Sequence, residues 1–154
     1  MSNHIVVRDL RGFMLLEALI GMLIFSIGVL GLVSLQSNAI KTATDARGRS
    51  EAAFLANQVV ARMWTDRTNL AAYSLNPFDA ACAVGSNSSL HPPLANWLGY
   101  VQGAGGDPGL LPGADGLIQQ IALGANNEVT VTLCWVVPGG EVHRHVARSQ
   151  IRFN

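Results

Sequence analysis

The longest hydrophobic stretch of the chain runs from Gly12 to Leu35 and is broken by only a few polar residues. These are Glu17, Ser26 and Ser34, and the stretch is preceded by Arg8, Asp9 and Arg11. At a rise of ~1.5 Å per residue, the roughly 23 residues from Phe13 to Leu35 form a helix of about 34 Å, which matches a ~30 Å hydrocarbon core. The pattern predicts one membrane-spanning helix over residues 13–36.

The hydrophobic pattern changes but stays helical after this stretch. From Gln36 to about Arg67 there is no proline, and small or apolar residues recur at helical spacing. They are Ala52, Ala53, Ala56, Val59, Val60 and Met63. This predicts an amphipathic continuation of the helix over residues 37–67, with an apolar face that packs on a globular head. Gly48 and the segment from Thr42 to Asp45 are predicted to form its weakest turn.

The remaining residues, 68–154, are called the head and begin with irregular segments. Asn69 to about His91 is rich in turn-forming residues and predicts a loop. Pro92 and Pro93 are expected to open a short helix, with Leu94, Trp97, Leu98 and Val101 on its buried face and Gly103 after its end. The segment from Gly103 to Gly116 contains so many glycines and prolines that no regular structure is expected in it.

Three strands are predicted in the last third of the chain. Leu117 to Leu123 is the first, and Glu128 to Val137 is the clearest because apolar residues alternate with Thr130, Thr132 and Cys134. The last strand is expected from about Glu141 to Phe153. Together they predict an α+β fold, in which a three-stranded antiparallel sheet lies across the C-terminal half of the long helix.

The carboxylate of Glu17 is the unusual feature of the predicted membrane helix, because a lone acid in lipid costs on the order of 2.5–3.5 kcal/mol. A short polar leader ending in Gly12, then Phe13, then an acid at Glu17 inside an apolar helix resembles the processing signal of type IV prepilins. The sequence LLEALIGMLIFSIGVLGLVSLQ is similar to that of minor pilins. The resemblance covers about residues 8 to 60.

The resemblance implies a pilin-like fold and a processing pathway. Residues 1–12 would be a leader removed between Gly12 and Phe13 by a prepilin peptidase, and the new amine of Phe13 would be methylated. Glu17 would then pair with that ammonium, in its own chain or in a neighbouring subunit, and so serve subunit assembly.

The resemblance also implies location and partners. The chain would be a single-pass protein of the bacterial inner membrane with a cytoplasmic N-terminus and a periplasmic head, and would later enter a pilus at the cell surface that supports twitching motility and adhesion. Its partners would be other minor pilins, the major pilin, the inner-membrane pilus assembly machinery and membrane lipid. Pseudopilins of type II secretion share the same cleavage signature and are the first alternative.

A conventional secretory signal is a further alternative for the N-terminus. Ser37-Asn38-Ala39 has the small residues of a cleavage site, which would make Ile40 the mature N-terminus. The apolar stretch is, however, far longer than the usual ~7–15 residues of such a signal, and it contains Glu17. Basic residues flank the span on both sides, so the positive-inside rule does not set its orientation.

Charge and cysteine content narrow the classes of function. The formal net charge is +0 and 13% of residues are charged, which argues against nucleic acid as the main partner.

The two cysteines, Cys82 and Cys134, both follow the predicted span, and a lone pair in an exported domain is most simply a disulfide. Two buried free thiols are the alternative.

The sequence offers little for catalysis or metal binding. Glu141, His143 and His145 alternate along the last predicted strand, but ligands on one edge strand make a weak site, and a solvated edge that also bears Arg144 and Arg148 is the preferred interpretation. No cofactor or metal is predicted, and no catalytic motif is found. The prediction is a non-enzymatic protein, and the alternative from another class is a single-span anchored enzyme or periplasmic binding domain.

Overall fold

The fold is described from a computed structural model that covers residues 11–104, 107–137 and 139–152. The chain divides into two compact units, Met1–Lys41 and Thr42–Asn154. The leader residues 1–10 lie outside the described residues.

The predicted long helix is present as α1, Arg11–Thr65, and it begins before the predicted cleavage site. Gly48 and the segment from Thr42 to Asp45 are helical, as the continuous helix requires, and their lower stability within the helix stays a prediction. Within the C-terminal unit, α1 buries a stripe made of Ala52, Leu55, Ala56, Val59 and Met63. The predicted stripe was therefore largely correct, although it omitted Leu55 and included the half-buried Ala53 and Val60.

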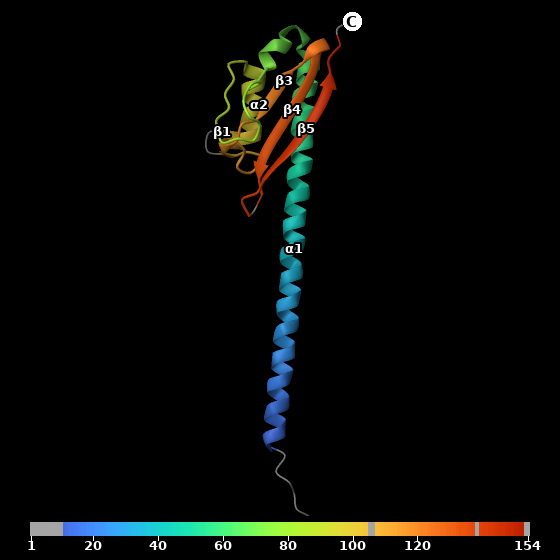
Figure 1. Cartoon of the computed structure of the whole chain (residues 1–154), viewed down its shortest axis with the longest axis vertical. Helices are drawn as coiled ribbons and strands as arrows, with labels where there is room; N and C mark the ends of the chain where they lie inside the picture. Colours follow the sequence, from blue (N-terminus) through green and yellow to red (C-terminus); the bar gives the residue numbers. More distant parts are fainter. Residues whose placement is uncertain (1–10, 105–106, 138, 153–154) are drawn as a thin grey trace, which may run out of the picture. The chain divides into compact units, whose positions relative to one another are not determined.

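The predicted antiparallel meander is confirmed in strand order β3-β4-β5 (Figure 1). The strands are β3 Gln120–Leu123, β4 Glu128–Val136 and β5 Val142–Gln150. In β4 the side chains of Val129, Val131, Leu133 and Trp135 are buried and belong to the same core as the buried stripe of α1. The fold is therefore α+β, with one long N-terminal helix and a small sheet.

The short helix α2, Pro92–Gln102, completes this core. Its buried residues are Leu94, Trp97, Leu98 and Val101, as the sequence predicts. The indole Nε1 of Trp97 donates a hydrogen bond to the carbonyl oxygen of Leu55 at 3.0 Å, which joins α2 to α1. Leu111, Ile121 and Ile151 belong to the same core, so segments from along the whole head contribute to it.

Two segments expected to be irregular contain short regular elements. The predicted loop from Asn69 overlaps the 3-10 helix η1, Arg67–Tyr73, whose Leu70 and Tyr73 are buried. The segment from Gly103 contains two paired short strands, β1 Gly103–Ala104 and β2 Asp107–Pro108, and the 3-10 turn η2, Ala114–Gly116. Glycine at position 109 makes the β1–β2 pairing possible, because a Cβ there would collide with the backbone carbonyl of Val101.

The face of the sheet turned away from α1 is partly covered. Thr132 and Cys134 lie on this face by strand alternation, yet they are buried. The covering segment follows η1 and carries Cys82, which is bonded to Cys134. The side chain of Gln120 adds hydrogen bonds from Nε2 to the carbonyl oxygens of Asn76 at 3.2 Å and Asp79 at 3.0 Å. The sheet is thus enclosed on both sides at β3 and β4.

Candidate functional site

The membrane-length part of α1 exposes its apolar side chains on all sides. From Phe13 to Leu35 the large apolar residues have exposed fractions between 42% at Val29 and 74% at Phe25. The helix is long and apolar enough to cross a membrane. A soluble helix normally buries such side chains against a core, and lipid or other apolar helices would cover those of this segment.

Glu17 lies in this exposed segment and is its only ionisable residue between Phe13 and Ile40. Among the side chains that the structure describes, none forms an ion pair with it. Ser26, by contrast, satisfies its hydroxyl inside the helix, since its Oγ donates to the carbonyl oxygen of Met22 at 2.7 Å. Glu17 therefore needs a cationic partner from outside the described side chains whenever it is removed from water.

Gly48 marks a close approach between α1 and the sheet. It is buried, and a Cβ built on it would lie 2.6 Å from Nε1 of Trp135. The indole of Trp135 thus packs directly on the helix backbone. Sequence reasoning treated Gly48 as a weak point in a helix, whereas its role is to admit a large side chain from β4.

The predicted solvated edge of β5 is only half correct. His143 has a side chain that is 21% exposed, with Nδ1 3.0 Å from Oδ1 of Asp45 and the ring centroid 5.8 Å from that of Trp135. His143 and His145 face α1, because Trp135 and His143 are opposite each other in the register. Arg144 and Arg148 lie on the exposed face. Among the described residues, no group of three or more His, Cys, Asp or Glu side chains is placed to hold a metal.

Asp66 organises the end of α1. Its carboxylate accepts hydrogen bonds from Nδ2 of Asn69 at 2.7 Å and from the hydroxyl of Tyr73 at 3.3 Å, and it lies 3.2 Å from Nε2 of His91. Burial raises the pKa of the Tyr73 phenol above its usual value, and the negative charge of Asp66 raises it further. This cluster fixes the turn that leads from α1 into η1.

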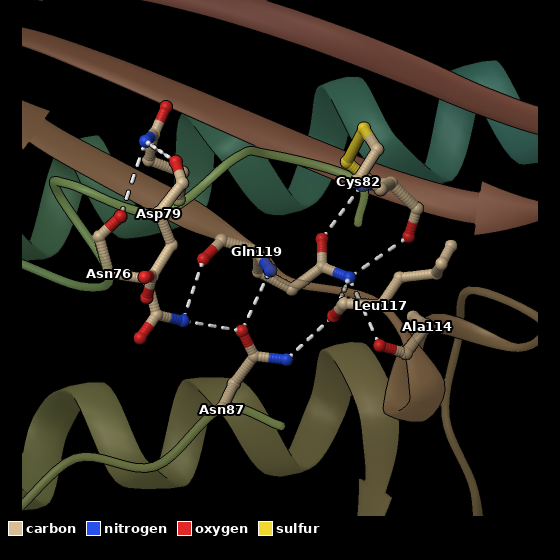
Figure 2. The surroundings of a disulfide bond; sticks show 9 residues. Asn76, Asp79, Cys82, Asn87, Ala114, Leu117 and Gln119 are labelled. Atoms are coloured by element: carbon tan, nitrogen blue, oxygen red, sulfur yellow. Dashed lines mark hydrogen bonds between the residues drawn. A yellow bond between two sulfur atoms is a disulfide. The ribbon is translucent and has the colours of Figure 1, made fainter. Parts of the chain in front are cut away.

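The disulfide lies beside a network of side-chain amides that includes the buried Gln119 (Figure 2). The structure joins Cys82 and Cys134, the pair expected from the sequence, with their Cα atoms 5.3 Å apart. Gln119 is fully buried, its Oε1 accepts from the backbone N–H of Cys134 at 2.7 Å, and its Nε2 donates to the carbonyl oxygen of Cys134 at 3.1 Å. A side-chain amide therefore takes the place of a neighbouring strand beside Cys134.

Two asparagines extend this network. The Oδ1 of Asn87 accepts from the backbone N–H of Gln119 at 2.7 Å and from Nδ2 of Asn76 at 2.8 Å. Its Nδ2 donates to the carbonyl oxygen of Leu117 at 2.7 Å. The sequence analysis did not predict a role for Gln119, Asn76 or Asn87. The only available signal was a pair of glutamines between apolar residues of a predicted strand, at Gln119 and Gln120.

One hollow opens where α1 meets the end of β4. It has a volume of about 250 Å³ and is lined in part by Gly48, Glu51, Leu110 and Trp135. This is below the ~300–1,000 Å³ of ordinary small-molecule sites. The indole Nε1 of Trp135 has no hydrogen-bond partner but is covered by its surroundings, so it is not available to a ligand. The hollow gives no support to a small-molecule binding function.

The chain matches no protein-family model, no curated protein and no solved structure. Its own residues are therefore the basis for an assignment of function.

Proposed function

We propose that this chain is a non-enzymatic minor pilin, a subunit that takes part in the assembly of a type IV pilus. The observation that carries the proposal is the carboxylate of Glu17, which has no ion-pair partner among the described side chains and lies in an exposed apolar helix, four residues after Phe13. After cleavage at Gly12–Phe13, the Phe13 ammonium of a neighbouring subunit would supply the missing positive charge. Among pilins, the resemblance is greatest to the minor pilin PilV.

The proposal explains why one chain combines an exposed apolar helix with a small enclosed head. The helix would first lie in the inner membrane and then exchange lipid for the helices of other minor pilins and the major pilin. A prepilin peptidase and the inner-membrane assembly machinery are the required partners. The disulfide accords with a head that faces the periplasm.

The first test is processing. When the chain is produced together with a prepilin peptidase, intact-mass measurement is expected to give a protein that starts at Phe13 and carries one methyl group on its amine. Gly12→Leu is expected to block cleavage because the side chain obstructs the peptidase. A mature protein that starts at Ile40 would instead indicate a conventional signal peptide and refute the proposal.

The second test separates assembly from anchoring. Glu17→Gln is expected to leave membrane insertion intact, and to ease it, because a charge that is costly in lipid is removed. Incorporation into sheared filaments should fall strongly, since a neighbour's ammonium then enters an apolar layer without its counter-charge. Glu51→Gln is the matched control, because Glu51 is a half-buried acid of the same helix whose ion pair among the described residues is with the exposed Arg47. Normal incorporation of Glu17→Gln would refute the assembly role.

The pseudopilin alternative predicts the same processing but assembly into a type II secretion system. Loss of protein secretion with intact pili, on deletion of the gene, would favour a type II secretion pseudopilin over a pilus subunit. The structure offers no observation that favours an anchored enzyme.

A further inference from the structure

The outer face of β5 carries a row of positive charge. Val142 to Arg152 contains three arginines, two histidines and no acid, in a chain with a formal net charge of +0. The histidines face α1, as described above. Arg144 and Arg148 project from the opposite face, where they alternate with Val142 and Val146, and all four side chains are exposed.

These arginines have no acidic partner within the described part of the chain. The ion pairs of the C-terminal unit involve Arg47 and Arg49 and leave out Arg144, Arg148 and Arg152. The residues opposite Arg144 and Arg148 on β4 are Cys134 and Thr130, which are uncharged. Neither arginine therefore has an acid directly opposite it, although Glu128 lies on the same face of β4, diagonal to Arg148.

The backbone of β5 is also open on one side. It is the last strand of the order β3-β4-β5, and among the described residues no backbone hydrogen bond joins Val142–Gln150 to a segment other than β4. About half of its N–H and C=O groups consequently point away from the sheet and are available to another strand.

We propose that β5 is a docking edge for an extended acidic segment of a partner protein, which adds to the sheet as a fourth strand. The backbone edge would provide hydrogen bonds, and the arginines would provide selection by charge. Arg144 and Arg148 are four residues apart, or about 13 Å along a strand. Acidic residues at positions i and i+4 of an added strand match this spacing.

Charge also argues against a second copy of this chain as the occupant. Pairing of β5 with another β5 would bring arginine rows together, and like charges on neighbouring strands are unfavourable. The nearby acids Glu128 and Glu141 lie only toward the two ends of the row.

The test uses the full chain in uncharged detergent micelles and measures peptide binding by fluorescence anisotropy. The probe is a twelve-residue peptide without proline, with glutamates at alternate positions and threonine or valine between them. Three further peptides serve as comparisons: one with lysine for glutamate, one N-methylated on alternate backbone nitrogens, and one with the glutamates clustered at one end.

The double variant Arg144→Gln/Arg148→Gln is expected to raise the dissociation constant of the acidic peptide at least about tenfold. The double variant Lys41→Gln/Arg47→Gln removes two positive charges from α1 instead. It is expected to change the dissociation constant of the acidic peptide less than about twofold. The N-methylated peptide is expected to bind at least about tenfold more weakly than its parent, because it cannot pair along the edge.

Hydrogen exchange gives an independent measurement, since the bound peptide is expected to protect amides of Val142–Gln150 that are exposed in the free protein. Three results would overturn the proposal. They are equal loss of binding in both double variants, equal binding of the N-methylated peptide, and a self-associated chain whose β5 amides are already protected without peptide.

Discussion

Gly48 shows how much a single missing side chain contributes to this fold. A Gly-to-Ala change inside a helix usually stabilises it by roughly 0.5–1 kcal/mol. At position 48 the added carbon would lie 2.6 Å from the indole of Trp135, a rigid group held in the core. Packing against the sheet should therefore outweigh helix propensity at this residue.

Gly48→Ala is thus expected to lower the free energy of unfolding by about 1–3 kcal/mol, the usual cost of overpacking. The measurement is urea unfolding followed by circular dichroism. Gly116→Ala is the control, since a Cβ there meets nothing within 4 Å, and it should leave stability nearly unchanged. An increase in stability with Gly48→Ala would show that the close contact does not constrain the fold.

Tyr73 gives the head a defined sensitivity to alkaline pH. Its pKa is raised in the folded state by burial and by Asp66, so the folded protein holds the phenol proton more tightly than the unfolded chain does. The corresponding stability is fully present below the unfolded pKa of about 10 and is lost as the pH rises through the higher folded value.

The free energy of unfolding is therefore expected to fall as the pH rises above about 10, and Tyr73→Phe should flatten this fall. The control is Tyr100→Phe, because Tyr100 is 54% exposed and should leave the pH profile unchanged. Identical pH profiles for the wild type and Tyr73→Phe would contradict this account of the Asp66 cluster.

At the scale of elements, the sequence predicts what depends on local pattern. The helix, the strand β4 and the buried face of α2 follow from the periodicity of apolar residues, and all are found. The elements that were missed depend on contacts between distant residues. The β1–β2 pairing requires Gly109 to pass the backbone of Val101, and burial of Tyr73 requires the remainder of the core.

The candidate site divides in the same way. Phe13 and Glu17 are recognisable from their spacing in an apolar run. The contact of Asp45 with His143 spans almost the whole C-terminal unit, and the hydrogen bonds of Gln119 to Cys134 join two different segments. No local sequence pattern predicts these two contacts. Amide side chains are especially difficult to predict, because the same residue types are common on solvated surfaces.

The disulfide is the main constraint on the segment that covers the sheet. Its cysteines are 52 residues apart, and closing such a loop is worth about 4 kcal/mol on the chain-entropy estimate. The Cys82→Ala/Cys134→Ala variant is expected to lose stability of this order in urea unfolding.

Hydrogen exchange should show which segment loses protection when the disulfide is removed. The amide of Cys82, which donates to the carbonyl oxygen of Ile118 at 3.0 Å, should exchange much faster in the double variant. Amides of α2 serve as the internal control and should respond only through global unfolding. Unchanged exchange at Cys82 would mean that the amide network alone holds the segment.

At the scale of the whole molecule, the membrane-length helix and the core use separate residues. Every residue of the hydrophobic core lies at or after Ala52, whereas the exposed apolar run ends near Leu35. A chain that begins at Thr42 is expected to be water-soluble and folded, since it retains the whole core and both cysteines.

Slow hydrogen exchange in β4, matching that of the full chain in micelles, would verify this. An additional Leu133→Ala change serves as a control for sensitivity, because it empties a buried site and should cost about 2–5 kcal/mol. A truncated chain with native helix content but no protected β4 amides would show that the head depends on the preceding residues.

The position of Ile151 in the core has a consequence for the time course of folding. It is fully buried, and its backbone N–H bonds to the carbonyl oxygen of Asn127, so the core joins α1 to a residue that follows β5. Contacts that join α1 to β5 span most of the C-terminal unit, and such contacts form slowly. The apolar face of α1 can therefore be covered completely only after β5 and Ile151 have been synthesised. Until then that face is available to chaperones and to unwanted association.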